Sequence, residues 1–124
     1  MKNSKLLIID DDEKLRFNLS LFFDDEGFDC IAVDTAEKAL KLIEVNRFGF
    51  AIVDLRLPGI NGVEFVLKAN LIDPAMSCFF YTGSNEFILS EELKKIGLTP
   101  KDIFLKPISD MKVILYRIME KLEL

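Results

Sequence analysis

Acidic side chains directly follow two apolar runs of strand character. Asp10, Asp11 and Asp12 come after residues 6–9, and Asp54 comes after residues 48–53. An ionised carboxylate is costly beside a buried strand unless it lies at the strand's exposed end with partners. Taken alone, Asp54 is therefore either a turn residue or the reactive group of a site.

Two further apolar runs end in a residue that can contact an anion. Thr82 follows residues 76–81, and Lys106 follows residues 101–105. Each polar residue has an ordinary explanation: a strand-ending hydroxyl, an exposed lysine before a turn, or, for Asp10, Asp11 and Asp12, a helix-capping acidic cluster. A site is the better explanation only if the four strand ends meet.

If these residues do meet, their types fit a phosphoryl acceptor. Clustered carboxylates repel one another, and protonation or a cation relieves the repulsion. The chain has no histidine, which excludes histidine catalysis and the usual zinc sites, so an all-oxygen cluster favours Mg²⁺. The suited reaction is attack of a carboxylate on a phosphoryl group, with Lys106 and Mg²⁺ neutralising charge and Thr82 donating a hydrogen bond.

Bulk properties predict one cytoplasmic domain over residues 1–124. Half of the residues are hydrophobic and 30% are charged, and the net charge of -5 comes without a basic stripe, which argues against nucleic-acid binding. No apolar stretch is long enough for a membrane span or a signal peptide. Cys30 and Cys78 are predicted to be buried free thiols.

Five strand patterns alternate with five helix patterns along the chain. The strands are predicted at residues 5–9, 29–33, 48–53, 76–81 and 101–105. The helices are predicted to begin after Asp12, at a capping box that starts with Asp34, past the turn at Pro58 and Gly59, near Phe87, and after Ser109.

Strict alternation of strands and helices implies right-handed crossovers and a parallel sheet covered on both faces. The site of such a sheet lies outside the carboxyl ends of its strands. That rule brings Asp10, Asp11, Asp54, Thr82 and Lys106 to one edge and makes a shared site the better explanation.

Four segments together resemble the receiver domain of the bacterial two-component response-regulator family over essentially the whole chain. They are residues 7–12 (LIIDDD), 52–62 (IVDLRLPGING), 81–83 (YTG) and 104–107 (FLKP). The resemblance implies an α/β, flavodoxin-like (βα)5 three-layer sandwich with a five-stranded parallel sheet in the order 2-1-3-4-5.

The resemblance also implies a role for each site residue. Asp54 would be the phosphoacceptor, with Thr82 and Lys106 contacting the phosphoryl group and a cis bond between Lys106 and Pro107. The Mg²⁺ ligands would be Asp11, Asp54, the backbone carbonyl of Arg56, and Asp10 through a water.

The implied function is a signalling module in a two-component phosphorelay, not an enzyme, although it would support its own phosphotransfer and dephosphorylation. The donor would be a phosphohistidine of a sensor histidine kinase or a histidine phosphotransfer protein. The fourth helix, fifth strand and fifth helix would form the output face and could support a homodimer, with neither nucleic acid nor membrane as a direct partner.

Two departures from the family pattern bear on the switch. Ile103 stands where the family usually has an aromatic residue, and Phe104 is predicted to face the opposite side of the sheet. Arg56 places a long cation at the mouth of the site.

The chain ends at Leu124 without an effector domain, so a stand-alone regulator and a receiver excised from a longer protein both stay open.

Two other functions compete with the signalling module. A Mg²⁺-dependent phosphatase working through an aspartyl phosphate would usually carry a second acid two residues beyond the nucleophile, where this chain has Arg56. A flavodoxin-like nucleotide or flavin binder would need a glycine-rich loop after the first strand, where this chain has Asp10, Asp11 and Asp12.

Overall fold

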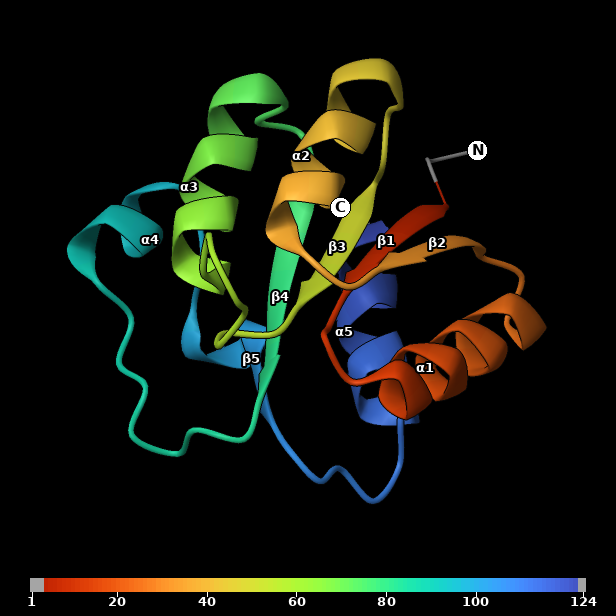
Figure 1. Ribbon diagram of the computed structural model, residues 1–124. Helices are drawn as coiled ribbons and strands as arrows, with labels where there is room; N and C mark the ends of the chain where they lie inside the picture. The colour runs from red at the N-terminus through yellow and green to blue at the C-terminus, as the bar shows by residue number, and fades with distance from the viewer. Residues whose placement is uncertain (1–3, 123–124) are drawn as a thin grey trace.

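A parallel five-stranded sheet lies between two helical layers in the computed structural model, which describes residues 4–122 (Figure 1). The strands are β1 (Lys5–Ile9), β2 (Asp29–Val33), β3 (Phe50–Val53), β4 (Ser77–Thr82) and β5 (Ile103–Leu105). The helices are α1 (Glu13–Asp25), α2 (Ala36–Val45), α3 (Gly62–Ile72), α4 (Glu91–Lys95) and α5 (Lys112–Leu122), with a 3-10 turn, η1, at Pro100–Asp102. The sheet order β2-β1-β3-β4-β5 confirms the predicted fold class.

Each face of the sheet carries its own hydrophobic core. The first core packs α2, α3 and α4 on one face, and the second packs α1 and α5 on the other, as the two helical layers of Figure 1 show. Alternate residues of the central strands enter opposite cores: Leu7 and Ile9 belong to the first, and Leu6 and Ile8 to the second. This arrangement explains the continuous apolar runs, because both faces of each central strand are buried.

Side-chain caps set where the first two helices begin. Asp12 caps α1 by accepting the Leu15 amide at 3.2 Å, as predicted. The cap of α2 is Thr35, which accepts the Lys38 amide, so the predicted capping role of Asp34 is wrong by one residue. Asp34 instead pairs with the Lys38 ammonium at 2.8 Å.

The fourth helix is much shorter than predicted. It begins after Ser90, whose hydroxyl accepts the Leu93 amide, and ends before Gly97, which has a φ of 103°. Phe87 precedes the helix and packs edge-on against Phe80 at 5.3 Å between ring centroids. Phe87 and Leu89 therefore pack in the first core from a loop, which an apolar spacing alone does not distinguish from a helix.

The C-terminal part also differs from prediction at two boundaries. Residues before β5 form the turn η1, since the Thr99 hydroxyl accepts the Lys101 amide, so the strand is shorter than expected. Ser109 does not cap the last helix, because α5 begins only at Lys112, whose amide is accepted by the side chain of Asp110. The peptide bond between Lys106 and Pro107 is cis, as the resemblance implied.

Neither cysteine is in a disulfide. Cys78 on β4 is buried and Cys30 on β2 is partly buried, and two strands separate them in the sheet. Within residues 4–122, no helix is both long and apolar enough to cross a membrane.

Candidate functional site

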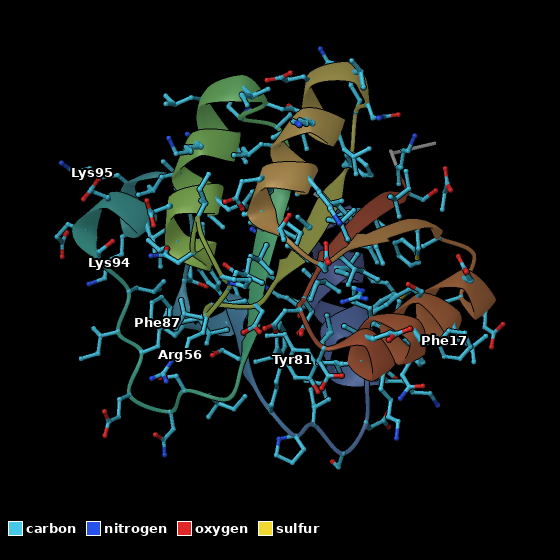
Figure 2. All side chains as sticks on the ribbon, in the orientation of Figure 1. Phe17, Arg56, Tyr81, Phe87, Lys94 and Lys95 are labelled. Atoms are coloured by element: carbon cyan, nitrogen blue, oxygen red, sulfur yellow. The ribbon has the colours of Figure 1, made fainter. Side chains whose placement is uncertain are left out.

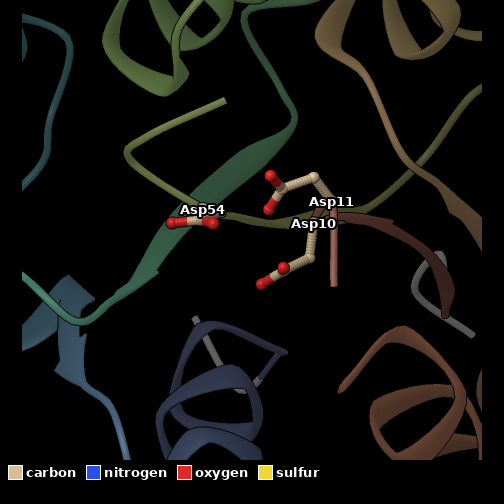
Figure 3. Close-up of side chains that lie close together, drawn as sticks. All are labelled: Asp10, Asp11 and Asp54. Atoms are coloured by element: carbon tan, nitrogen blue, oxygen red, sulfur yellow. The ribbon is translucent and has the colours of Figure 1, made fainter. Parts of the chain in front are cut away.

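Three carboxylates converge at the carboxyl edge of the sheet. Asp10 and Asp11 follow β1, and Asp54 follows β3, the strand that pairs with β1. Each offers one oxygen, and these oxygens lie within 4.8 Å of one another. Figure 3 shows the Asp10 and Asp11 side chains extending from the end of β1 toward Asp54.

Hydrogen bonds with the backbone hold Asp10 and Asp54 in place. The Asp54 amide donates to the Ile9 carbonyl at 2.9 Å, which continues the β1–β3 pairing up to the site. One Asp10 carboxylate oxygen accepts the Asp12 amide at 2.9 Å, and the Asp10 carbonyl accepts Arg16 Nη1 at 2.8 Å. Sheet pairing therefore positions Asp54, and the backbone of Asp12 together with the Arg16 side chain positions Asp10.

Gly62 lets the start of α3 lie directly against the backbone of Asp54. A Cβ at this position would collide with the Asp54 carbonyl and would lie 2.9 Å from Leu55 Cα. The Gly62 amide also donates to the Leu55 carbonyl at 2.9 Å. The close approach therefore needs glycine and holds the segment after β3 in place.

Lys106, at the end of β5, bridges two of the acids. Its ammonium lies 2.8 Å from Asp10 Oδ2 and 3.4 Å from Asp54 Oδ2. Burial opposes its charge, but the hydrogen bond and charge of Asp10, together with Asp54, hold the pKa of Lys106 above its ordinary value. Lysine and aspartate meet as predicted, with Asp10 as the nearer partner.

The Asp54 carboxyl lies in an environment that penalises its charge. The residue is 8% exposed. Burial, followed by the negative charge of Asp10, raises the pKa of Asp54, and Lys106 offsets only part of this rise. A bound cation would relieve the same repulsion.

Thr82 and Arg56 complete the mouth of the site. Both line an open pocket with Asp54, Lys106 and the segment 83–86. The Thr82 hydroxyl is nearly inaccessible to solvent and accepts the Ser84 amide at 3.1 Å. The Arg56 side chain is exposed beside the pocket (Figure 2). A phosphoryl-sized anion in this pocket would meet a hydroxyl and an ammonium group.

The donor set fits a hard divalent cation. Asp10, Asp11 and Asp54 supply only carboxylate oxygens, the ligand type that suits Mg²⁺. The structure therefore brings Asp10, Asp11, Asp54, Thr82 and Lys106 together, as the strand-end argument predicted. The role of the Arg56 carbonyl as a ligand stays a prediction.

Two residues that contact the site, Arg16 and Tyr81, were not predicted from the sequence. Arg16 holds the Asp10 carbonyl from the first turns of α1. Tyr81, one residue before Thr82, lies beneath the Lys106 ammonium, 5.5 Å from ring centroid to Nζ. The available signal was a tyrosine placed next to the predicted hydroxyl residue, but its apolar strand made a core role the simpler interpretation.

Two bacterial proteins are similar in sequence to this chain over most of its length. Sporulation initiation phosphotransferase F of Bacillus subtilis (strain 168) is 28% identical over 97 residues, covering 78% of each chain. Transcriptional regulatory protein FixJ of Bradyrhizobium diazoefficiens is 29% identical over 105 residues, and the match covers 85% of this chain but only 50% of FixJ.

Solved structures and a family model also match this chain. A CheY-like response regulator receiver domain protein from Methanospirillum hungatei JF-1 matches with a TM-score of 0.81 and 28% identity, covering 98% of this chain and 95% of that one. A two-component response regulator from Clostridium difficile has the same fold, with a TM-score of 0.85 at 20% identity over 97% of this chain and 96% of that one. The model of the response regulator receiver domain matches residues 6–118. With its acidic cluster, lysine and hydroxyl at the carboxyl edge of this sheet, the chain belongs to the response regulator receiver domain family.

Proposed function

We propose that the chain accepts a phosphoryl group on Asp54 from a phosphohistidine of a partner protein. A carboxylate oxygen of Asp54 attacks phosphorus, the P–N bond to the donor imidazole breaks, and its electron pair stays on the imidazole nitrogen. The product is an acyl phosphate. The observation that carries the proposal is the bridge from Lys106 to both Asp10 and Asp54, next to a pocket that Asp54, Lys106 and Thr82 line.

Two side chains would stabilise the charge of the transferred group. The Lys106 ammonium, already 3.4 Å from Asp54, would pair with a phosphoryl oxygen as a positive point charge. The Thr82 hydroxyl would donate a hydrogen bond to another phosphoryl oxygen. Preorganised donors of this kind stabilise the charge of a phosphoryl transfer because they need little reorganisation during the reaction.

Asp11 and Asp54 would hold Mg²⁺ directly, with the Arg56 carbonyl as a further ligand and Asp10 acting through a water. When bound, the ion supplies positive charge that neutralises the carboxylates and the phosphoryl oxygens. The oxygen donors that cluster within 4.8 Å support this assignment.

The partner would be a sensor histidine kinase or a histidine phosphotransfer protein in the cytoplasm. The chain contains no histidine and must therefore obtain phosphohistidine from another protein. The word phosphotransferase in the name of the Bacillus relative agrees with such an exchange. The module proposed here spans residues 1–124.

The output surface proposed for the module is the face of α4, β5 and α5. Large apolar side chains are exposed on it at Leu105, Val113, Tyr116 and Met119. This face would contact a downstream partner or a second copy of the chain, since exposed apolar side chains favour protein contacts.

Replacement of Asp54 by alanine tests the phosphoacceptor. Wild type incubated with acetyl phosphate and Mg²⁺ should gain one phosphoryl group by intact mass, and Asp54→Ala should gain none. Asp25→Ala, which removes an exposed acid at the end of α1, is the matched control and should be labelled like wild type. Undiminished labelling of Asp54→Ala would contradict the assignment, and sustained turnover of a phosphate ester would favour the phosphatase instead.

A further inference from the structure

Tyr81 is a buried tyrosine whose two ends contact different parts of the site. It lies on β4, is 3% exposed, and packs in the second core with α1 and α5. Its neighbour Thr82 lines the pocket on the Asp54 side. Figure 2 shows Tyr81 at the carboxyl end of the sheet, toward α1 and α5.

The ring of Tyr81 limits where the Lys106 ammonium can lie. Nζ is 5.5 Å from the ring centroid, within the range in which a cation is attracted to an aromatic face. The same ammonium is shared between Asp10 at 2.8 Å and Asp54 at 3.4 Å. The lysine is thus held by two acids and by a ring that belongs to the neighbouring strand.

The hydroxyl of Tyr81 holds the segment that leads into α5. It accepts the Ile108 amide at 3.3 Å. Ile108 follows Lys106 by two residues and packs against the second core, which also contains Ile114 and Ile118 of α5. One side chain therefore contacts both the charged head of Lys106 and the backbone between β5 and α5.

We propose that Tyr81 is a positioning residue, which holds the Lys106 ammonium beside Asp54 and couples its position to the start of α5. This inference rests on the proposed phosphorylation of Asp54. Negative charge added at Asp54 draws Lys106 away from Asp10 and changes its position over the ring, and the hydroxyl transmits this change to Ile108.

This coupling runs on the side of the sheet opposite to Ile103. Ile103 packs against the first core, whereas Tyr81, Phe104 and Ile108 belong to the second. A chain without a large ring at Ile103 therefore still has an aromatic residue that connects its phosphorylation site with a helix of the output face.

The tyrosine content of the chain provides a direct spectroscopic test. The sequence has two tyrosines and no tryptophan. In Tyr116→Phe, emission excited in the tyrosine band comes from Tyr81 alone, and it should change when Mg²⁺ and beryllofluoride bind as a phosphoryl mimic. In Tyr81→Phe, where Tyr116 is the remaining emitter, the change should be lost. A change that stays in Tyr81→Phe and is absent from Tyr116→Phe would overturn the proposal.

Two substitutions at Tyr81 separate the ring from the hydroxyl. Tyr81→Phe keeps the ring and should be labelled by acetyl phosphate at the wild-type rate, whereas Tyr81→Leu should be labelled about fivefold more slowly because it loses the contact with Lys106. In Tyr81→Phe, the beryllofluoride-induced amide shifts of residues 108–113 should shrink while those of residues 82–84 persist. Tyr116→Phe is the matched hydroxyl deletion and should keep the beryllofluoride-induced shifts of residues 108–110, which precede α5.

The outcomes distinguish this inference from the proposed function. Wild type that is not labelled at Asp54 contradicts the proposed function itself. Labelled wild type, with Tyr81→Leu equally fast and Tyr81→Phe showing unchanged shifts at residues 108–113, overturns only the role of Tyr81. Circular dichroism melting of each variant checks that it is folded, and the Tyr81→Phe shifts decide the question if Tyr81→Leu does not fold.

Discussion

At the residue scale, the cluster of Asp10, Asp11 and Asp54 makes metal binding measurable as a change in stability. A cation that binds only the folded state stabilises it by mass action, and here it would also relieve repulsion among three carboxylates. We expect millimolar Mg²⁺ to raise the melting temperature of wild type. The gain should shrink in Asp11→Ala, which lacks one of the proposed direct ligands.

The control for the metal prediction is Asp25→Ala, which has the same charge change at an exposed helix end. Its gain in melting temperature on adding Mg²⁺ should equal that of wild type. Equal gains in wild type and Asp11→Ala, measured by differential scanning fluorimetry, would argue against a metal site at the acidic cluster.

The thiol of Cys78 should be protected from alkylation in the native protein. Burial raises its pKa from 9.0 to about 12, so the reactive thiolate is scarce at pH 8. Iodoacetamide should react slowly with native protein and rapidly in urea, as followed by mass spectrometry with peptide mapping. Native Cys78 that reacts as fast as in urea would show that the thiol is not buried.

The same pKa shift has a consequence for stability. The native pKa of Cys78 lies above the unfolded value, so the folded state favours the protonated thiol. This contribution is fully present below about pH 9 and is lost as the pH rises toward about 12. Alkaline unfolding should therefore begin at lower pH than if Cys78 had the same pKa in the folded and unfolded states.

Residue types and strand ends were sufficient to predict which acids meet, because parallel strands present their carboxyl ends at one edge. They did not predict that Lys106 lies closer to Asp10 than to Asp54, since side-chain geometry decides between two acids at one edge. The contacts of Tyr81 were missed for a similar reason. Its partners, Lys106 and the Ile108 amide, come from a different strand and loop.

At the element scale, an ion pair joins η1 to α5. The buried Asp102 carboxylate accepts the Thr99 amide at 2.9 Å and Arg117 Nε at 2.8 Å. Arg117→Leu would leave a buried acid without its cation, and we expect a loss of about 3 kcal/mol in the free energy of unfolding. Urea denaturation at neutral pH measures this change.

The matched control for Arg117 is Glu120→Gln, which removes only the exposed second partner of the arginine, 3.3 Å away. An exposed pair of this kind contributes less than about 1 kcal/mol. A loss for Arg117→Leu no larger than that for Glu120→Gln would mean that the bond to Asp102 does not stabilise the packing of α5.

The boundaries of α4 and β5 were the least predictable features of the fold. The apolar spacing from Phe87 to Ile96 fits a helix, yet Phe87 packs on Phe80 from a loop, because a tertiary contact outweighs a weak local preference. Likewise, the Asp102 carboxylate accepts the Thr99 amide and stabilises a 3-10 turn where a strand was expected. The predicted helix start near Phe87 and the predicted strand start at Lys101 were both wrong because side-chain contacts, which the local pattern does not contain, decide these boundaries.

At the scale of the whole molecule, the topology was predictable because it follows from alternation and handedness rather than from side-chain detail. Continuous apolar runs such as residues 6–9 required burial on both faces, and the two cores meet that requirement. The proposed connection from Asp54 to α5 was not predictable. It depends on contacts between β4 and the segment after β5, which no local pattern records.

The sheet and the segment after β4 should differ widely in local stability, which hydrogen exchange can measure. β1 and β3 each pair with two neighbouring strands, and their side chains are almost wholly buried. The segment 83–90 lies between β4 and α4 and belongs to no helix or strand, and the Ser84 amide donates to the Thr82 hydroxyl at 3.1 Å. Amides without partners exchange through small local openings, whereas those of a central strand exchange only on global unfolding.

We therefore expect the amides of Leu7 and Ile52 to exchange most slowly and those of residues 85–89 to exchange fastest. Beryllofluoride and Mg²⁺ should slow amide exchange both in the central strands and in residues 85–89, and the effect should be larger in the strands. The central strands gain the full binding free energy because their exchange requires global unfolding, whereas the loop gains protection only as far as the ligand orders it. Amide exchange followed by NMR or mass spectrometry checks this order. If residues 85–89 were as protected as β3 before any ligand is added, the segment after β4 would be as stable as the sheet, and phosphorylation would have little left there to order.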